Sequence, residues 1–281
     1  MRPLSLLDRC TVRPLRCKTA VAVGLLLLCS ISTFAWTYES EEVLTGNAAQ
    51  LRFGVDFTKK WRNGIRLGVS EDLRFDVYNS LVGPSFRKSY TTIDLGYRPI
   101  EYVRLDLGYT LKIFGPNSTW SDAKKADANE WIRHRLYFSV TGSYTFDYAK
   151  IFLRERAQLD MRSDSVNLLE KNRFDWCLRS RLGAEALIPG KPVKPYLWVE
   201  LVNTLNAPEY QQRNGHQFIT SVRTQAGVKW RLTRLSSLDF FYRFTYGYDR
   251  DINITKKKGY IQLKEETLFM HSIGVNYNLD W

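Results

Sequence analysis

The chain has 281 residues, of which 41 are Lys or Arg and 29 are Asp or Glu, so its formal net charge is +12. A hydrophobic content of 44% and an aromatic content of 14% exclude a disordered chain. Beyond the N-terminal segment there is no run of about 18 uncharged apolar residues, which excludes a bundle of membrane-spanning helices. A disulfide framework is excluded too, because only Cys177 lies beyond the first 29 residues.

The N-terminus predicts an export signal. Basic residues within positions 1–18 precede the apolar stretch Thr19–Ala35, which ends in small residues. We predict cleavage after Ala35, so that 1–35 is a signal peptide and 36–281 is a single domain. Two alternatives are a permanent helical anchor, for which this stretch is short, and lipid attachment at Cys29, where Leu28 is bulkier than the usual pattern allows.

The rest of the chain alternates apolar and polar residues with a period of two, which is typical of β-strands. Most of these segments reach the roughly 9–11 residues that a membrane-spanning strand needs. In chain order the segments are 51–57, 65–77, 89–97, 103–111, 131–145, 149–161, 173–182, 195–205, 216–230, 238–248 and 267–281.

The glycines indicate which face of these strands points inward. Nearly all of them share the charged face, and small residues are useful where side chains crowd inside a narrow barrel. They are Gly54, Gly68, Gly96, Gly108, Gly183, Gly227, Gly247 and Gly274, with Gly142 as the exception. We therefore predict a charged interior and an apolar, lipid-facing exterior. Glu155 falls on the apolar face, which predicts a local bulge or a position near the membrane interface.

Short and long connections alternate along the chain, as in outer-membrane barrels. The fold prediction is all-β: an antiparallel up-and-down transmembrane β-barrel of twelve strands, with ten as the alternative. The twelfth strand is assigned to Trp36–Leu44, and Phe114–Glu130 and Asp249–Glu266 are expected to be long external loops. The last strand carries Tyr277, Leu279 and Trp281 in alternation, which resembles the C-terminal signal that the bacterial barrel-assembly machinery reads.

The order of these segments resembles a family of bacterial outer-membrane barrels filed as domain-of-unknown-function family 2490. The resemblance implies a fold and a bacterial outer-membrane location, and it carries no functional residues. The resembling stretches are Trp61–Leu73, Thr92–Leu111, Asn172–Leu187, Pro195–Asn206 and Val222–Tyr246.

Arginines concentrate on the predicted inner face of three consecutive strands, and they predict a track for anions because the planar guanidinium binds carboxylates and phosphates bidentately. The candidates are Arg133, Arg135, Arg154, Arg156, Arg173, Arg179 and Arg181. The candidate acids beside them are Asp175, Glu185 and Glu200. The leading hypothesis is a narrow channel or binding barrel for small anionic solutes. The alternative is a closed structural or surface-interaction barrel, in which these charges pair and fill the interior and the loops act.

A lipid-modifying enzyme is a third hypothesis without a motif. No catalytic residue, metal site or cofactor is predicted, since His134, His216 and His271 are not at metal-ligand spacing from one another or from cysteine. The expected partners are outer-membrane lipid, the assembly machinery during biogenesis and a small anionic solute. We expect a monomer. We expect no binding of nucleic acid, because the arginines alternate along strands rather than forming one exposed patch.

Overall fold

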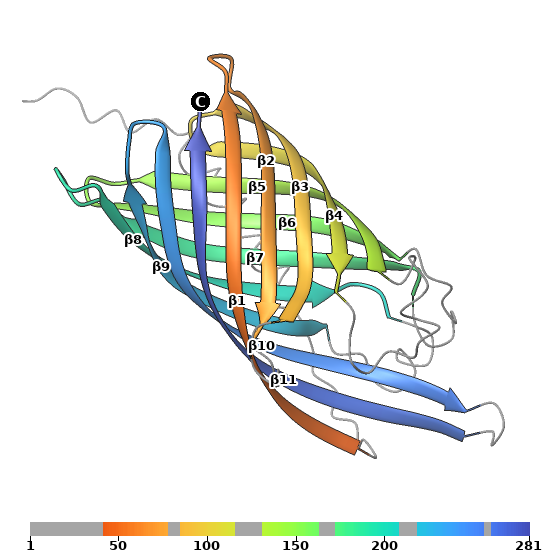
Figure 1. The fold of residues 1–281 in the computed structure, drawn as a ribbon. Helices are drawn as coiled ribbons and strands as arrows, with labels where there is room; N and C mark the ends of the chain where they lie inside the picture. The colour runs from red at the N-terminus through yellow and green to blue at the C-terminus, as the bar shows by residue number, and fades with distance from the viewer. Residues whose placement is uncertain (1–41, 78–84, 116–130, 163–171, 208–217, 256–259) are drawn as a thin grey trace, which may run out of the picture. The chain divides into compact units, whose positions relative to one another are not determined.

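The computed structural model describes residues 42–77, 85–115, 131–162, 172–207, 218–255 and 260–281, which form a closed barrel of eleven strands (Figure 1). The strands are β1 (Glu42–Lys60), β2 (Ile65–Asp76), β3 (Ser85–Ile100), β4 (Val103–Phe114), β5 (Ile132–Thr145), β6 (Ala149–Arg162), β7 (Phe174–Ala186), β8 (Val193–Thr204), β9 (Ile219–Arg231), β10 (Ser236–Thr255) and β11 (Tyr260–Asp280). No helix in these ranges is long and apolar enough to cross a membrane. The prediction of an all-β barrel is confirmed.

The barrel closes through a parallel pair. Each strand pairs antiparallel with its neighbour in the chain, so β1 and β11 run in the same direction and can join only in parallel. Their register runs from Glu42 opposite Lys264 to Thr58 opposite Asp280. This closure gives eleven strands, in place of the predicted twelve or ten. Residues 36–41 of the strand predicted at Trp36–Leu44 lie outside the described residues, and its last three residues begin β1.

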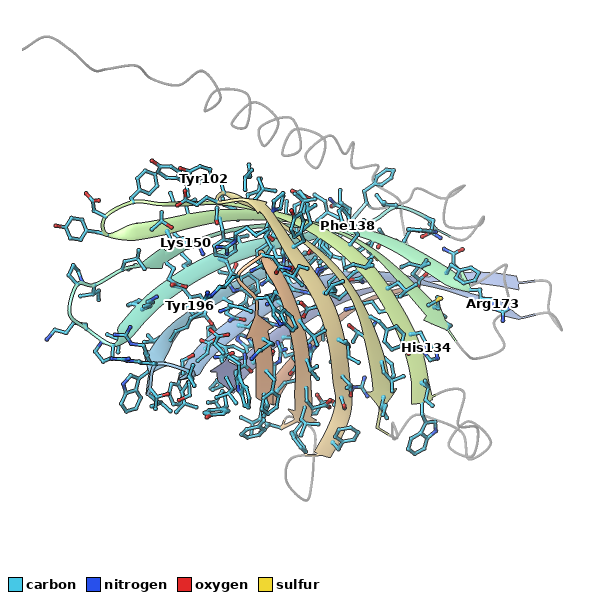
Figure 2. All side chains as sticks on the ribbon, turned by 90° about the horizontal axis from the view of Figure 1, so that it is seen from above. Tyr102, His134, Phe138, Lys150, Arg173 and Tyr196 are labelled. Carbon is cyan, nitrogen blue, oxygen red and sulfur yellow. The ribbon has the colours of Figure 1, made fainter. Side chains whose placement is uncertain are left out.

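The barrel wall is polar inside and apolar outside. Large apolar side chains on alternating strand positions are exposed, with Leu107 at 60% and Ile273 at 63%, whereas Glu200 and Ser139 on the inner face are at 0%. Figure 2 shows the side chains on both faces of the wall, with Phe138 on the outside. The predicted orientation of the two faces is therefore correct, and it is the reverse of the arrangement in a water-soluble barrel.

Glycines on the inner face make room for aromatic rings from the neighbouring strand. A Cβ atom on Gly108 would lie 2.2 Å from Cζ of Tyr137, and one on Gly183 would lie 2.5 Å from Cζ of Phe152. Gly108 lies directly opposite Tyr137 in the β4–β5 register. The rings therefore lie along the wall rather than projecting across the interior, which confirms the argument from crowding.

Two local expectations are wrong. Asp249–Glu266 is not mainly a loop, because Asp249–Thr255 continue β10 and Tyr260–Glu266 begin β11 in one paired hairpin. Its polar sequence hid the pairing. Glu155 lies in the middle of β6, and the pairings on both sides of it have no bulge. Its carboxylate is instead stabilised by Ser180 Oγ, which donates to Oε2 at 2.7 Å. Glu71 on β2 likewise accepts a bond from Thr91 Oγ1 at 2.6 Å.

We call the end of the barrel with the short connections the turn end and the opposite end the loop end. The described connections at the turn end are 61–64, 101–102, 146–148, 187–192 and 232–235. Most of Phe114–Glu130, predicted as an external loop, lies outside the described residues.

Candidate functional site

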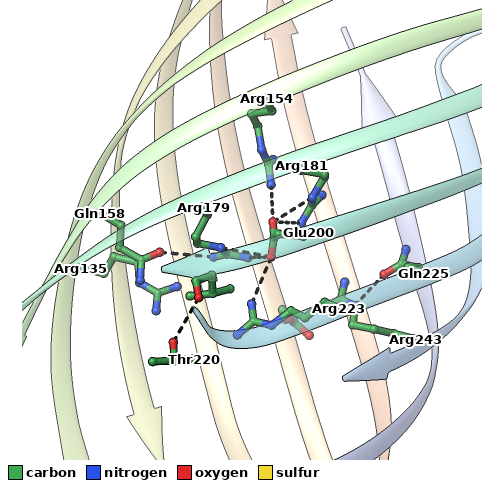
Figure 3. Close-up of polar contacts among 12 residues, drawn as sticks. Arg135, Arg154, Gln158, Arg179, Arg181, Glu200, Thr220, Arg223, Gln225 and Arg243 are labelled. Carbon is green, nitrogen blue, oxygen red and sulfur yellow. Dashed lines mark hydrogen bonds and ion pairs between the residues drawn. The ribbon is translucent and has the colours of Figure 1, made fainter. Parts of the chain in front are cut away.

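A single row of charged side chains crosses four adjacent strands on the inner face. Arg154 on β6 lies opposite Arg181 on β7, which lies opposite Glu200 on β8, which lies opposite Arg223 on β9. Arg179 lies two residues from Arg181 on β7 and therefore on the same face. The alternation of each strand determines the face, and the register between the strands brings the charges together (Figure 3).

Glu200 is the centre of this row, and each of its carboxylate oxygens accepts bonds from two guanidinium groups. Oε1 accepts from Arg179 Nε at 3.2 Å and from Arg223 Nη1 at 3.3 Å. Oε2 accepts from Arg181 Nε at 2.9 Å and from Arg154 Nη2 at 3.2 Å. One negative charge is thus shared by four positive charges, and the row keeps a large positive excess.

Two further arginines extend the positive excess without a carboxylate of their own. Arg156 lies over the ring of Tyr137, 3.9 Å from its centroid, and Arg243 donates from Nε to Gln225 Oε1 at 2.7 Å. Neither forms an ion pair with a carboxylate in the described part of the chain. We call the six residues that surround or flank Glu200 the arginine belt; they are Arg154, Arg156, Arg179, Arg181, Arg223 and Arg243.

Aromatic residues contact the arginine belt on the side that faces the turn end. The guanidinium carbon of Arg181 lies 3.8 Å from the ring centroid of Trp198, and that of Arg243 lies 5.2 Å from the same ring. Trp198 packs in a buried cluster with Tyr196 and Phe241. Stacking on an aromatic face fixes the orientation of a guanidinium plane while leaving its N–H groups free to donate sideways.

Charged groups continue toward both ends of the barrel. On the loop side, Asp160 accepts from Arg135 Nε at 2.6 Å and from Lys112 Nζ at 2.6 Å. On the turn side, Glu185 pairs with Lys229 at 2.7 Å and with Lys194 at 3.7 Å. In both groups two cations share one carboxylate, so the positive excess extends along the interior.

The candidates from the sequence divide into three groups. Arg154, Arg156, Arg179, Arg181 and Glu200 come together in the arginine belt. Arg135 and Glu185 belong to the clusters on its two sides. The three remaining candidates, Arg133, Arg173 and Asp175, lie at the loop end.

Of these loop-end candidates, Arg173 is exposed and immediately precedes β7, and Asp175 pairs with Arg162 at 3.0 Å. Arg173 thus lies at the loop end, whereas Tyr102 lies at the other end of the barrel, the turn end (Figure 2). Arg133 is the second residue of β5, and its guanidinium carbon lies 4.8 Å from the ring centroid of Phe114.

Sequence reasoning missed six residues of these clusters: Arg223, Arg243, Lys112, Asp160, Lys194 and Lys229. All six lie on the polar face of strands whose alternation was recognised. The missing information was the register between strands, which places Arg223 beside Glu200 and Arg243 beside Gln225.

The described histidines form no arrangement of a hydrolase. His134 Nδ1 lies 2.6 Å from Tyr109 Oη, and His271 Nδ1 lies 2.7 Å from Tyr242 Oη. The described residues contain no group of His, Cys, Asp and Glu that could hold a metal ion. His216 lies outside the described residues.

The C-terminal residues complete the closing strand pair at the turn end. Trp281 N donates to Thr58 O at 2.7 Å, and Lys60 N donates to Trp281 O at 3.0 Å. Tyr277, Leu279 and Trp281 alternate with inward-facing Asn278 and Asp280, so their side chains lie on the outer face. Their role as an assembly signal stays a prediction.

Comparison with known proteins gives one family and one solved structure. No curated protein matches the chain. The solved structure is titled "NanC porin structure in rhombohedral crystal form"; it is 10% identical, with a TM-score of 0.42, and the match covers 69% of this chain and 86% of that chain. The family model described as "Protein of unknown function (DUF2490)" matches residues 47–255, which include most of the barrel and the whole arginine belt. The chain belongs to the DUF2490 family.

Proposed function

We propose that the protein is a monomeric outer-membrane β-barrel that binds or passes small anionic solutes through its interior. The membrane location is supported by the wall itself, because an exposed apolar exterior around a charged interior is stable in lipid and costly in water. The predicted export signal and the alternating C-terminal strand support delivery to the outer membrane by the barrel-assembly machinery.

The observation that carries the function is the ratio of charges around Glu200. Four arginines share its carboxylate, and Arg156 and Arg243 add two more positive charges nearby. Two like charges about 4 Å apart repel by roughly 4 kcal/mol at an effective dielectric constant of about 20. An interior with this excess attracts mobile anions, and rings of arginine select for anions in pores.

A closed barrel is the second candidate, and a specific observation favours it. Several ion pairs link different strands on the inner face, including Arg66 with Asp106 at 3.4 Å and Lys112 with Asp160 at 2.6 Å. Ser139 and Glu200 are fully buried. Small barrels are often filled by side chains in this way, and such a barrel would act through its surface.

Single-channel recording distinguishes the two candidates. The purified protein is inserted into a planar bilayer, and the reversal potential is measured under a salt gradient. We expect steady openings that prefer chloride over potassium. The double substitution of Arg179 and Arg181 by Gln removes two charges of the arginine belt and should reduce the anion preference severalfold.

The control is Arg104→Gln, which removes an inward-facing arginine on β4 that pairs with Asp106 at 3.0 Å. It should change the preference much less, because Asp106 already compensates its charge. A folded barrel that never conducts would contradict the channel and leave the closed barrel.

A further inference from the structure

Some N–H groups of the arginine belt have no acceptor among the residues that the structure describes. The Nε atoms of Arg154 and Arg156 are buried and make no hydrogen bond within the described residues. Leaving a buried polar donor unsatisfied is costly, and more so when the group is charged. Arg66 and Arg162 also have an unsatisfied Nε atom, but each of them pairs with a carboxylate, which Arg156 does not within the described residues. A buried donor on a cation without a counter-charge is the group that an anionic ligand would satisfy.

The location of these donors defines a site. Arg154 and Arg156 are successive inward-facing residues of β6, and they lie opposite Arg181 and Arg179 of β7. The positive charges of Arg154, Arg179 and Arg181 all repel that of Arg156. Glu200 contacts three of these four guanidinium groups and leaves Arg156 without a carboxylate. The uncompensated charge is therefore concentrated beside Arg156.

The orientation of Arg156 is fixed before any ligand arrives. Its guanidinium carbon lies 3.9 Å from the centroid of the Tyr137 ring, and that ring occupies the space above Gly108. A guanidinium stacked on a ring presents its N–H groups in the plane parallel to the ring. The glycine, the tyrosine and the arginine thus form a preorganised support for an anion, which lowers the ordering cost of binding.

We propose that Arg154 and Arg156, with Arg179 and Arg181 beside them, bind an oxyanion that carries two negative charges, of the phosphate type. This proposal rests on the proposed function and specifies the ligand class of the same interior. A carboxylate ligand would bring one charge and two oxygens, and the interior already contains one such group in Glu200. A phosphate group has a charge of about −1.5 to −2 and three strong acceptor oxygens, which suits donors that arrive from two strands.

The test is block of the chloride current by added anions at constant ionic strength. Inorganic phosphate and sulfate should block saturably at pH 8, and formate should block at least about tenfold more weakly. Sulfate controls for charge and shape because its charge does not change with pH in this range. Equal block by formate and phosphate would overturn the divalent site while leaving the anion channel intact.

Substitutions locate the site. Arg156→Gln should weaken phosphate block about tenfold or more, since it removes one charge-assisted donor. Arg104→Gln is the matched control and should leave the block within about twofold. Equal effects of the two substitutions would overturn the assignment to Arg156. Glycerol phosphate distinguishes the source: tighter block by the ester assigns a phosphorylated solute, and tighter block by inorganic phosphate assigns the free ion.

A barrel that does not conduct would contradict the channel and still permit a test of the site. Equilibrium dialysis of radiolabelled phosphate against the detergent-solubilised protein then measures binding directly. Saturable binding that Arg156→Gln abolishes and Arg104→Gln preserves would support the site. Binding that is absent, or that is equal in the two variants, would overturn it.

Discussion

Two regions of the inner wall solve the problem of buried charge in different ways. On β1–β4, inward-facing arginines pair with aspartates of the same strand or of strands one or two places away in the sheet; we call this region the aspartate wall. Its ion pairs are Arg52–Asp72, Arg74–Asp72, Arg66–Asp94, Arg66–Asp106 and Arg104–Asp106. On β6–β10, four arginines share Glu200 and two have no carboxylate at all. The first region is compensated within the protein, and the second keeps a positive excess, which we propose is compensated by an external anion.

The largest effect should follow from removing the shared carboxylate. Glu200→Gln leaves four buried guanidinium groups without their counter-charge, and breaking a buried pair in this way costs about 3–5 kcal/mol. Denaturant unfolding in detergent measures the loss.

Asp56→Asn is the control, because Asp56 faces inward and forms no ion pair with an arginine within the described residues. It should leave the unfolding free energy nearly unchanged. Equal losses in the two variants would show that Glu200 is not the centre of the arginine belt.

Removing single arginines should separate the two regions. Arg66→Gln deprives Asp94 and Asp106 of a partner in the aspartate wall and should cost about 3 kcal/mol. Arg243→Gln loses a hydrogen bond to Gln225 and relieves repulsion from neighbouring cations, so its cost should stay below about 1 kcal/mol. Thermal unfolding of both variants at low salt tests this order, and the reverse order would contradict the comparison.

The support beneath Arg156 should also be measurable. Gly108→Ala forces the Tyr137 ring to move, because the new Cβ would lie 2.2 Å from its Cζ, and overpacking of this kind costs about 1–3 kcal/mol. Gly247→Ala is the matched control, since its nearest atoms lie 3.8 Å away. Phosphate block should weaken in the first variant only. Equal unfolding free energies for the two variants would show that the Tyr137 ring is not packed tightly against Gly108.

The smallest effect should come from the outer wall. Glu155→Gln removes a carboxylate that faces the apolar exterior and retains an oxygen that can accept from Ser180. We expect unchanged conductance and an unfolding free energy in lipid that is equal to or up to about 1 kcal/mol above that of the wild type. A loss of conductance would mean that the face of this residue is wrongly assigned.

The sequence predicts faces well and neighbours poorly. Period-two alternation placed Arg154, Arg156, Arg179 and Arg181 on the inner face, because side-chain direction along a strand is a local property. It could not place Arg223 beside Glu200, because register depends on turn geometry and pairing over the whole strand.

The strand count failed for a related reason. The predicted counts, twelve and ten, are both even, which would place the two ends of the chain on the same side of the membrane. Whether β1 instead joins β11 in parallel is decided by contacts between distant segments of the chain, which the local sequence pattern does not reveal. The hairpin at 249–266 was missed because only Ile252 and Ile254, with their partners Leu263 and Ile261, carry an apolar alternation in a mostly polar segment.

The parallel seam between β1 and β11 has a consequence for the order of folding. Every other strand pair joins neighbours in the chain and can form as a hairpin, whereas the seam pairs Glu42 with Lys264. Contacts of such long sequence separation form slowly because the entropy of a large loop must be lost first. Until the backbone bonds between Trp281 and Thr58 form, both terminal strands present open edges that can pair with another chain. We therefore expect closure to be the last step, and we expect a chain that lacks its final strand to remain an open, aggregation-prone sheet.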